Sequence, residues 1–281
     1  MNYRHFYHAG SFADLMKHLI LIAVIEKMKE KPTPFTVLDA FGGTGVYNLD
    51  SEEAEKTGEY RSGIAHSFTS FSQGDTANNI ASSPPTSTHF LSYTKIIGEL
   101  NINSDRLLYP GSPYIISELL RPGDSLIACE LHKEDFITLK QNITYPVHNI
   151  DAYNAIKAFL PTNTARGLVF LDPAFEVKDE FSKLIDALKL IRKRFSAGIV
   201  MIWYPIKNPN IVQKFYQDVK DTDYAEFLKI EFEIENDMLA MDKCGVLIAN
   251  PPHINDQLKL MMHFLCDVIY NGKAKSTVEL I

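Results

Sequence analysis

Cysteine is scarce in this sequence, and positive charge is not in excess. The 281 residues include three cysteines, Cys129, Cys244 and Cys266, which lie far apart and lack metal-ligand spacing. They predict neither a disulfide framework nor a zinc site, and two of them lie in or after apolar runs typical of a core. The formal net charge is -7. This charge argues against a protein that coats nucleic acid through a broad basic surface, but it does not exclude a local basic patch.

The start of the chain has no apolar run of membrane-spanning length. The most hydrophobic early run, Leu19 to Ile25, is too short to cross a bilayer. Charged residues at 26, 27 and 29 follow it, where a signal peptide would have a small-residue cleavage site. We therefore expect a core helix, opened by Ser11 and Asp14 at capping-box spacing, in a reduced, cytoplasmic protein without a membrane association.

The standard nucleotide-binding fingerprints are also missing. Phe35 to Asp39 is an apolar run typical of a buried strand, and it leads into a glycine-rich loop at 40–45. The spacing of these glycines matches neither G-x-G-x-x-G nor a loop that ends in GK[ST]. A strand that ends in Asp and continues into such a loop is instead the arrangement that adenosylmethionine-binding methyltransferases use.

Apolar strands alternate with helices along the rest of the chain. The strands are expected at 35–39, 125–130, 148–151, 167–171, 199–204, 226–234 and 245–249. This alternation predicts a single α/β domain over 1–281, with a doubly wound, Rossmann-like sheet of order 3-2-1-4-5-7-6 and an antiparallel edge strand. Residues 47–122 form a mostly helical insertion after strand 1, and the Ser/Thr-rich stretch at 67–88 within it is expected to be a flexible loop.

Acidic residues end three strands of the predicted sheet. Glu130, Asp151 and Asp172 follow strands two, three and four, beside the glycine loop that follows strand one. Ligands of open α/β sheets bind at this edge, where an acid after strand two can accept hydrogen bonds from ribose hydroxyls. Asp151 is placed to accept from an adenine amino group. Each acid alone could cap a strand end or start a turn, but three in register favour a binding site.

The stretch from Gly167 to Phe175 indicates the reaction. Its apolar strand ends in Asp172, Pro173, Ala174 and Phe175, which resembles the D-P-P-Y/F motif of amino-methyltransferases that act on adenine. An exocyclic amine is a poor nucleophile because its lone pair is delocalised into the ring. The Asp172 carboxylate and the Pro173 carbonyl can accept its N–H bonds and free that lone pair. Phe175 would stack on an extruded base, and no metal or covalent enzyme intermediate is needed.

The first ten residues combine aromatic and basic side chains, Tyr3 and Arg4 among them. Such a segment suits contact with a base or a phosphate, although surface clusters of this kind are also common as packing edges. Candidates for a local basic patch are Arg4, Lys17, Arg61 and the cluster at 192–194.

Several unrelated short motifs occur in a fixed order along nearly the whole chain, outside the Ser/Thr-rich loop. They are Tyr3-Arg4-His5 with His8-Ala9-Gly10, Lys17-His18, Arg61 within Thr57 to Ile64, Tyr109 to Pro113, Glu130-Leu131-His132, Trp203-Tyr204-Pro205 and Asn250-Pro251-Pro252. Together they resemble the RlmJ family, the large-subunit ribosomal RNA adenine-N6 methyltransferases.

The resemblance implies a monomeric class I methyltransferase with S-adenosylmethionine as the methyl donor and one adenine of 23S ribosomal RNA as the acceptor. Asp172, with Pro173 and Phe175, would be catalytic, and Tyr3, Arg4 and Phe175 would contact the substrate. With the adjoining loop and strand-end positions, the expected donor site comprises Lys17, His18, Asp39, Phe41, Gly43, Ser112, Glu130, Asp151 and Ala152.

Two positions depart from the family pattern. Phe41 stands where the family has a histidine in its T-H-A-G-A-G loop, so a side-chain hydrogen bond to the donor is lost. Ala174 replaces the second proline of the D-P-P-Y motif, which loosens the turn that aims the Pro173 carbonyl. We predict weaker donor binding with activity retained. Two alternatives stay open: an adenine methyltransferase for DNA or nucleotides, and a non-catalytic RNA-binding relic.

Overall fold

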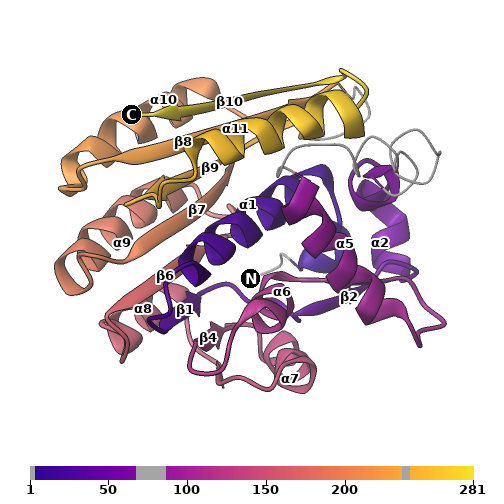
Figure 1. Cartoon of the computed structure of the whole chain (residues 1–281), viewed down its shortest axis with the longest axis horizontal. Helices are drawn as coiled ribbons and strands as arrows, with labels where there is room; N and C mark the ends of the chain where they lie inside the picture. Colours follow the sequence, from indigo (N-terminus) through magenta and orange to yellow (C-terminus); the bar gives the residue numbers. More distant parts are fainter. Residues whose placement is uncertain (1–3, 68–86, 236–240) are drawn as a thin grey trace.

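A single eight-stranded sheet organises the computed structural model, which describes residues 4–67, 87–235 and 241–281 (Figure 1). The strand order is β10-β8-β9-β7-β6-β1-β4-β5. The strands are β1 (Phe35–Asp39), β4 (Ser125–Cys129), β5 (Val147–His148), β6 (Arg166–Leu171), β7 (Ile199–Pro205), β8 (Phe227–Ile234), β9 (Lys243–Ala249) and β10 (Ala274–Leu280).

Strand direction divides the sheet into two parts. The run β5-β4-β1-β6-β7 is parallel, whereas β9 is antiparallel to both β7 and β8, and β10 is antiparallel to β8. The predicted doubly wound α/β sheet is confirmed. Its predicted order stopped one strand short, at β8, and the edge is formed by β10, which is antiparallel to β8. Strand β10 was missed because its Lys275 to Glu279 stretch is mostly polar and half exposed.

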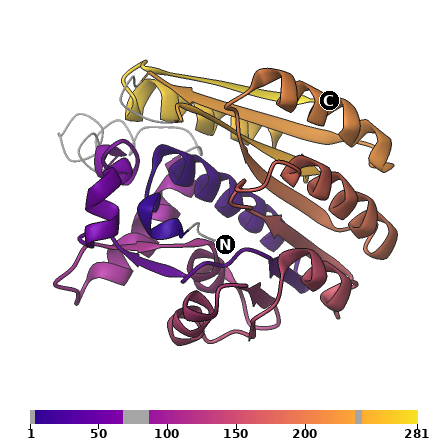
Figure 2. The same cartoon turned by 180° about the vertical axis from the view of Figure 1, so that it is seen from behind.

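Helices cover both faces of the sheet and enclose two apolar cores. Successive residues of a strand point to opposite faces, so Val37 of β1 joins one core and Leu38 joins the other. The first core lies under α1 (Phe12–Lys29), α5 (Ser87–Asn101), α6 (Ser112–Leu119) and α11 (Asn255–Phe264). The second lies under α8 (Ala152–Phe159), α9 (Glu180–Arg194) and α10 (Pro209–Asp218), which cover the face of the sheet turned to the viewer in Figure 2.

Helix α1 is buried on nearly every side, as the apolar run predicted. Ser11 is its N-cap and accepts a hydrogen bond from the Asp14 amide. The return half of the expected capping box is absent, because the Asp14 carboxylate accepts from the Gly10 amide at 2.9 Å. A helix that is apolar all round belongs in a core. The polar side chains in its first half, Asp14, Lys17 and His18, are buried with it, and Lys17 reaches Asp172 at the end of β6.

The insertion at 47–122 is held at its ends by a small second sheet. Strand β2 (Val46–Asn48) pairs antiparallel with β3 (Leu108–Pro110), which brings the start and end of the insertion together. Helices α2 (Glu52–Thr57) and α5 lie between them. Most of the predicted loop at 67–88 lies outside the described residues.

Helix α7 (Lys133–Asn142) follows β4 and was not predicted. Only Asp135 and Leu139 of α7 are buried, so the apolar periodicity that marks a helix is weak there. The three cysteines are free and buried, as expected of core residues. Within the described ranges, no helix is long and apolar enough to cross a membrane.

Candidate active site

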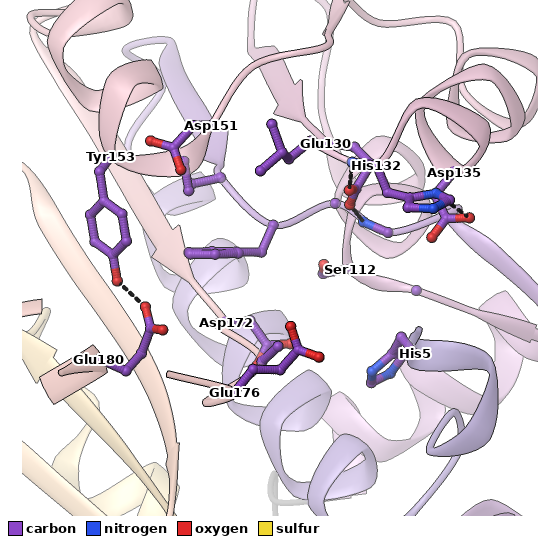
Figure 3. Close-up of a pocket in the computed structure, with 18 of the residues that line it drawn as sticks. His5, Ser112, Glu130, His132, Asp135, Asp151, Tyr153, Asp172, Glu176 and Glu180 are labelled. Carbon is purple, nitrogen blue, oxygen red and sulfur yellow. Dashed lines mark hydrogen bonds and ion pairs between the residues drawn. The ribbon is translucent and has the colours of Figure 1, made fainter. Parts of the chain in front are cut away.

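The carboxyl ends of β1, β4, β5 and β6 lie at one edge of the sheet, and the loops that follow them line a cavity of about 350 Å³. Figure 3 shows Asp172 near its middle, Tyr153 and Glu180 at one end and His132 at the other. Of the predicted site residues, those that line the cavity are Lys17, His18, Phe41, Gly43, Ser112, Glu130, Asp151, Ala152 and Asp172. Arg4, Asp39, Pro173 and Phe175 do not line it, and Tyr3 lies outside the described residues.

A buried ion network centred on Lys17 joins α1 to the end of β6. The Lys17 ammonium nitrogen lies 2.5 Å from an Asp172 carboxylate oxygen and 2.7 Å from one of Asp14. The other Asp14 oxygen lies 2.9 Å from Nε2 of His5. The Lys17 side chain is only 4% exposed. The charge of Lys17 is thus paired within the protein. Its contact with the carboxylate of the methyl donor stays a prediction.

Charge pairing outweighs burial in this network. Burial pushes the pKa of Asp14 upward, but His5 and Lys17 push it further down, so the net pKa lies well below the ordinary value. Burial lowers the pKa of Lys17, and the carboxylates of Asp14 and Asp172 more than reverse this, so the net pKa is raised. Lys17 is therefore a permanent cation between two carboxylates.

Asp39 has the opposite electrostatic balance. It is the last residue of β1 and is 0% exposed, and one of its carboxylate oxygens has no hydrogen-bond partner. Burial is the largest influence and raises its pKa to about 7, with a further upward contribution from Asp172. The Ser112 hydroxyl, the Phe41 amide and Lys17 oppose this rise. Asp39 adds a third carboxyl group to a region with one lysine.

Glu130 ties the glycine loop to the end of β4. Its two carboxylate oxygens accept hydrogen bonds from the Gly43 amide at 2.9 Å and the His132 amide at 2.6 Å. Gly43 has φ of +59°, and a Cβ at this position would lie 2.0 Å from the Tyr47 hydroxyl oxygen. Only glycine fits there. Burial raises the pKa of Glu130, while both amides lower it.

At the opposite end of the cavity, Asp151 is the N-cap of α8 and accepts from the Asn154 amide at 3.0 Å. Strand β5 ends at His148, so the prediction that the strand runs to Asp151 was wrong. The Asp151 side chain nevertheless lines the cavity. Beside it, the Tyr153 hydroxyl donates to Glu180, and the Phe41 ring lies 6.2 Å from the Tyr153 ring.

The turn after β6 presents Asp172 and holds Phe175 away from the cavity. Helix α9 begins only at Glu180, so Asp172 does not cap it. Phe175 has φ of +52°, a left-handed conformation that is costly for a bulky residue. Its ring lies 4.9 Å from Phe181 and 6.1 Å from Trp203. Stacking of Phe175 on a base stays a prediction.

The residues proposed for a basic patch are largely occupied by other contacts. Arg4 pairs with Asp135 at 2.6 Å, and Arg61 pairs with Glu55. Lys17 is buried, so its assignment to a surface patch was wrong. In the 192–194 cluster, the two arginine side chains donate to backbone carbonyls.

Several site residues were not predicted from the sequence. His5, Tyr153 and Glu180 line the cavity, and Asp14 and Trp203 support Lys17, whose nitrogen lies 5.6 Å from the Trp203 ring centre. The spacing of Asp14 and Lys17, three residues apart on a helix, was a usable signal of pairing. Among the described residues, no group of three or more His, Cys, Asp or Glu side chains is arranged to hold a metal.

Comparison with known proteins identifies the family. A family model described as "Ribosomal RNA large subunit methyltransferase D, RlmJ" matches residues 32–281. The chain belongs to the RlmJ family. Two curated RlmJ relatives, each named "Ribosomal RNA large subunit methyltransferase J", come from Haemophilus influenzae and Escherichia coli. Each is 34% identical, and each match covers all of this chain and 99% of the relative.

A solved structure has the same fold over almost the whole chain. Protein LPL1258 of Legionella pneumophila matches with a TM-score of 0.83 and 29% identity, over 97% of this chain and 98% of that one. The RlmJ-like sequence and the fold thus extend together over almost the whole chain.

The raised pKa of Asp39 predicts a pH-dependent stability. A carboxyl whose pKa is about 7 when folded and ordinary when unfolded loses its stabilising contribution as pH rises from about 4 to about 7. Relative to the Asp39→Asn variant, the wild type should become less stable over that range, by about 1.4 kcal/mol per unit of pKa difference. Urea unfolding at several pH values measures this difference.

The control is Asp186→Asn on α9, which removes an exposed carboxyl. This variant should track the wild type at each pH. A stability difference between wild type and Asp39→Asn that is constant from about pH 4 to about pH 7 would show that Asp39 is not held protonated.

Proposed function

We propose that this RlmJ-family protein transfers the methyl group of S-adenosylmethionine to N6 of an adenine in 23S ribosomal RNA. The observation that carries the proposal is Asp172, whose carboxylate lines the cavity at the end of β6 with one oxygen held by Lys17. Membership of the RlmJ family supports ribosomal RNA as the substrate. We further propose that the protein acts as a monomer.

The charge of the cavity suits the donor. Asp14 and Asp172 share one lysine, and Asp39, whose pKa Asp172 raises, has one oxygen without a partner. A buried carboxylate without a partner is costly, so a cation nearby is favourable. Adenosylmethionine carries a sulfonium and an ammonium group, and when bound it supplies a methyl group that is already activated for transfer.

Side chains along the cavity offer matching hydrogen bonds to the rest of the donor. We assign Glu130 to the ribose hydroxyls, Asp151 to the adenine amino group, and His18 and Ser112 to the methionine carboxylate. The remaining contacts come from the backbone at Phe41, Gly43 and Ala152. The hydrogen bond from the Gly43 amide to Glu130 holds the loop and the ribose acceptor in one position, which lowers the entropy cost of binding.

Asp172 is the proposed acceptor for the adenine amine. One carboxylate oxygen is held by Lys17, while the other has no hydrogen-bond partner among the described residues. That free oxygen can accept an N–H bond from the amine, with the Pro173 carbonyl accepting the second. Lys17 pairs with Asp172 and fixes the orientation of its carboxylate, which is the preorganisation that such a site requires.

The target adenine must leave its stack to reach this cavity. We propose that Tyr3 and Arg4 help to hold it, together with Phe175. Because the Phe175 ring packs on Phe181 and Trp203, its first effect is to fix the turn that carries Asp172. Direct stacking on the base would be an additional role.

Removal of the Asp172 carboxylate should abolish most of the activity. We expect Asp172→Ala to lower methyl transfer at least about 100-fold, the usual cost of losing a preorganised polar group. Lys17→Met should also lower it, because Asp172 loses its buried partner. The measurement is transfer of a labelled methyl group to protein-free 23S ribosomal RNA fragments, followed by analysis for N6-methyladenine.

Donor binding by calorimetry and RNA binding are the controls for both variants. Asp172→Ala should still bind RNA. If the wild-type protein binds these fragments but forms no N6-methyladenine, the RNA-binding relic is favoured. If it methylates adenine in DNA or free nucleotides in preference to RNA, the proposed substrate is wrong.

The departure at Phe41 predicts a gain of donor affinity. Phe41→His should restore a side-chain hydrogen bond to the donor and tighten binding roughly 2- to 10-fold, as expected from one net hydrogen bond. Phe41→Leu removes the ring without adding a hydrogen-bonding group and is the matched control. Calorimetric titration with adenosylmethionine compares the three proteins. Equal affinities for wild type and Phe41→His would contradict the prediction.

A further inference from the structure

Three buried side chains, joined in series by hydrogen bonds, connect the insertion to the cavity. They are His18 on α1, Tyr109 in β3 and Tyr93 on α5. The His18 Nδ1 atom lies 2.8 Å from the Tyr109 hydroxyl, which lies 2.9 Å from the Tyr93 hydroxyl. His18 is 1% exposed and both tyrosines are 0% exposed. The His18 and Tyr109 rings are also stacked, with centroids 5.7 Å apart.

Tyr93, the last residue of this hydrogen-bonded series, sets the direction of both hydrogen bonds. The Tyr93 hydroxyl has no partner other than Tyr109 among the described residues. If Tyr93 only accepted, its own proton would be buried and unpaired, which costs free energy. Tyr93 therefore donates to Tyr109. The single proton of Tyr109 is then directed to His18, so Nδ1 of His18 is the acceptor.

His18 is neutral in this environment. The pKa of His18 is lowered to about 3, chiefly by burial; the charges of Lys17 and His5 also act to lower it, and Asp14 alone opposes them. A neutral imidazole carries one proton, and Nδ1 accepts a hydrogen bond, so the proton is on Nε2. The His18 side chain lines the cavity, and Nε2 has no partner among the described residues.

We propose that Tyr93 and Tyr109 are positioning residues that fix His18 as the Nε2–H tautomer, so that it offers a neutral hydrogen-bond donor to an anionic group in the cavity. The identity of that group as the methionine carboxylate of adenosylmethionine rests on the proposed function. The opposite tautomer would turn a nitrogen lone pair toward the carboxylate and repel it. The insertion thus sets one hydrogen bond of the donor site through two buried hydroxyls.

The tautomer is measured in the ligand-free protein by nitrogen NMR of labelled histidines, with the His18 signals assigned from their loss in His18→Gln. We expect an unprotonated Nδ1 and a protonated Nε2 that do not titrate around neutral pH. Tyr109→Phe keeps the stacked ring but removes the hydroxyl, so the His18 signals should move toward a mixture of tautomers. Affinity for adenosylmethionine should fall roughly 2- to 10-fold, and Tyr93→Phe should give a smaller change in both.

Tyr204→Phe is the matched control. Tyr204 is also 0% exposed and bonds a second tyrosine, Tyr216, at 2.7 Å, but it belongs to the core on the other face of the sheet. This variant should change neither the His18 signals nor the affinity. Thermal unfolding checks that all three tyrosine variants are folded.

A protonated Nδ1 in the wild type overturns the proposal, as does Tyr109→Phe with unchanged His18 signals. If the expected tautomer is found and responds to Tyr109→Phe, but the wild type does not bind adenosylmethionine, the positioning role is supported and the proposed donor is wrong. The His18 NMR signals therefore test the tautomer, and the affinity for adenosylmethionine tests the proposed function.

Discussion

The buried ion pair between Lys17 and Asp172 is the constraint on which the arrangement of the site depends. It joins residues 155 positions apart in the sequence, at 2.5 Å. A buried ammonium is costly unless it is paired and hydrogen-bonded, and Asp14 supplies the second partner at 2.7 Å. Helix α1 must therefore lie where Lys17 reaches the end of β6. Its almost complete burial keeps it there.

Two further parts of the chain meet the same turn of α1. Asp14 pairs with His5 and accepts a hydrogen bond from the Gly10 amide. These two contacts fix the segment from residue 5 to residue 10 beside the cavity. His18 bonds Tyr109 of the insertion. One helical turn thus links the chain start, the insertion and the strand that carries the proposed catalytic acid. The ion pairs and hydrogen bonds made by this turn offset the cost of desolvating the buried polar residues of α1.

The sequence predicted what depends on local pattern and missed what depends on distant contacts. Glu130 and Asp172 were located correctly because each directly follows an apolar strand, and parallel strands end at one edge. The pairing of Lys17 with Asp172 has no local signal. The motif at Phe175 predicted a stacking ring, yet packing against Phe181 and Trp203 decides where the ring lies. Strand β10 was missed because an edge strand needs few apolar residues.

The same buried charges that cost stability favour a particular ligand. Asp39 is buried with an unpaired oxygen and a raised pKa, and Asp14 and Asp172 share one lysine. A fold selected for stability alone would replace Asp39 with an apolar residue. A cation in the cavity, which the neighbouring residues Ala40 and Phe41 line, would lower the cost of ionising Asp39. The proposed donor carries its sulfonium charge only before transfer. In the proposed reaction, the carboxylates would favour the cationic reactant over the neutral sulfur product.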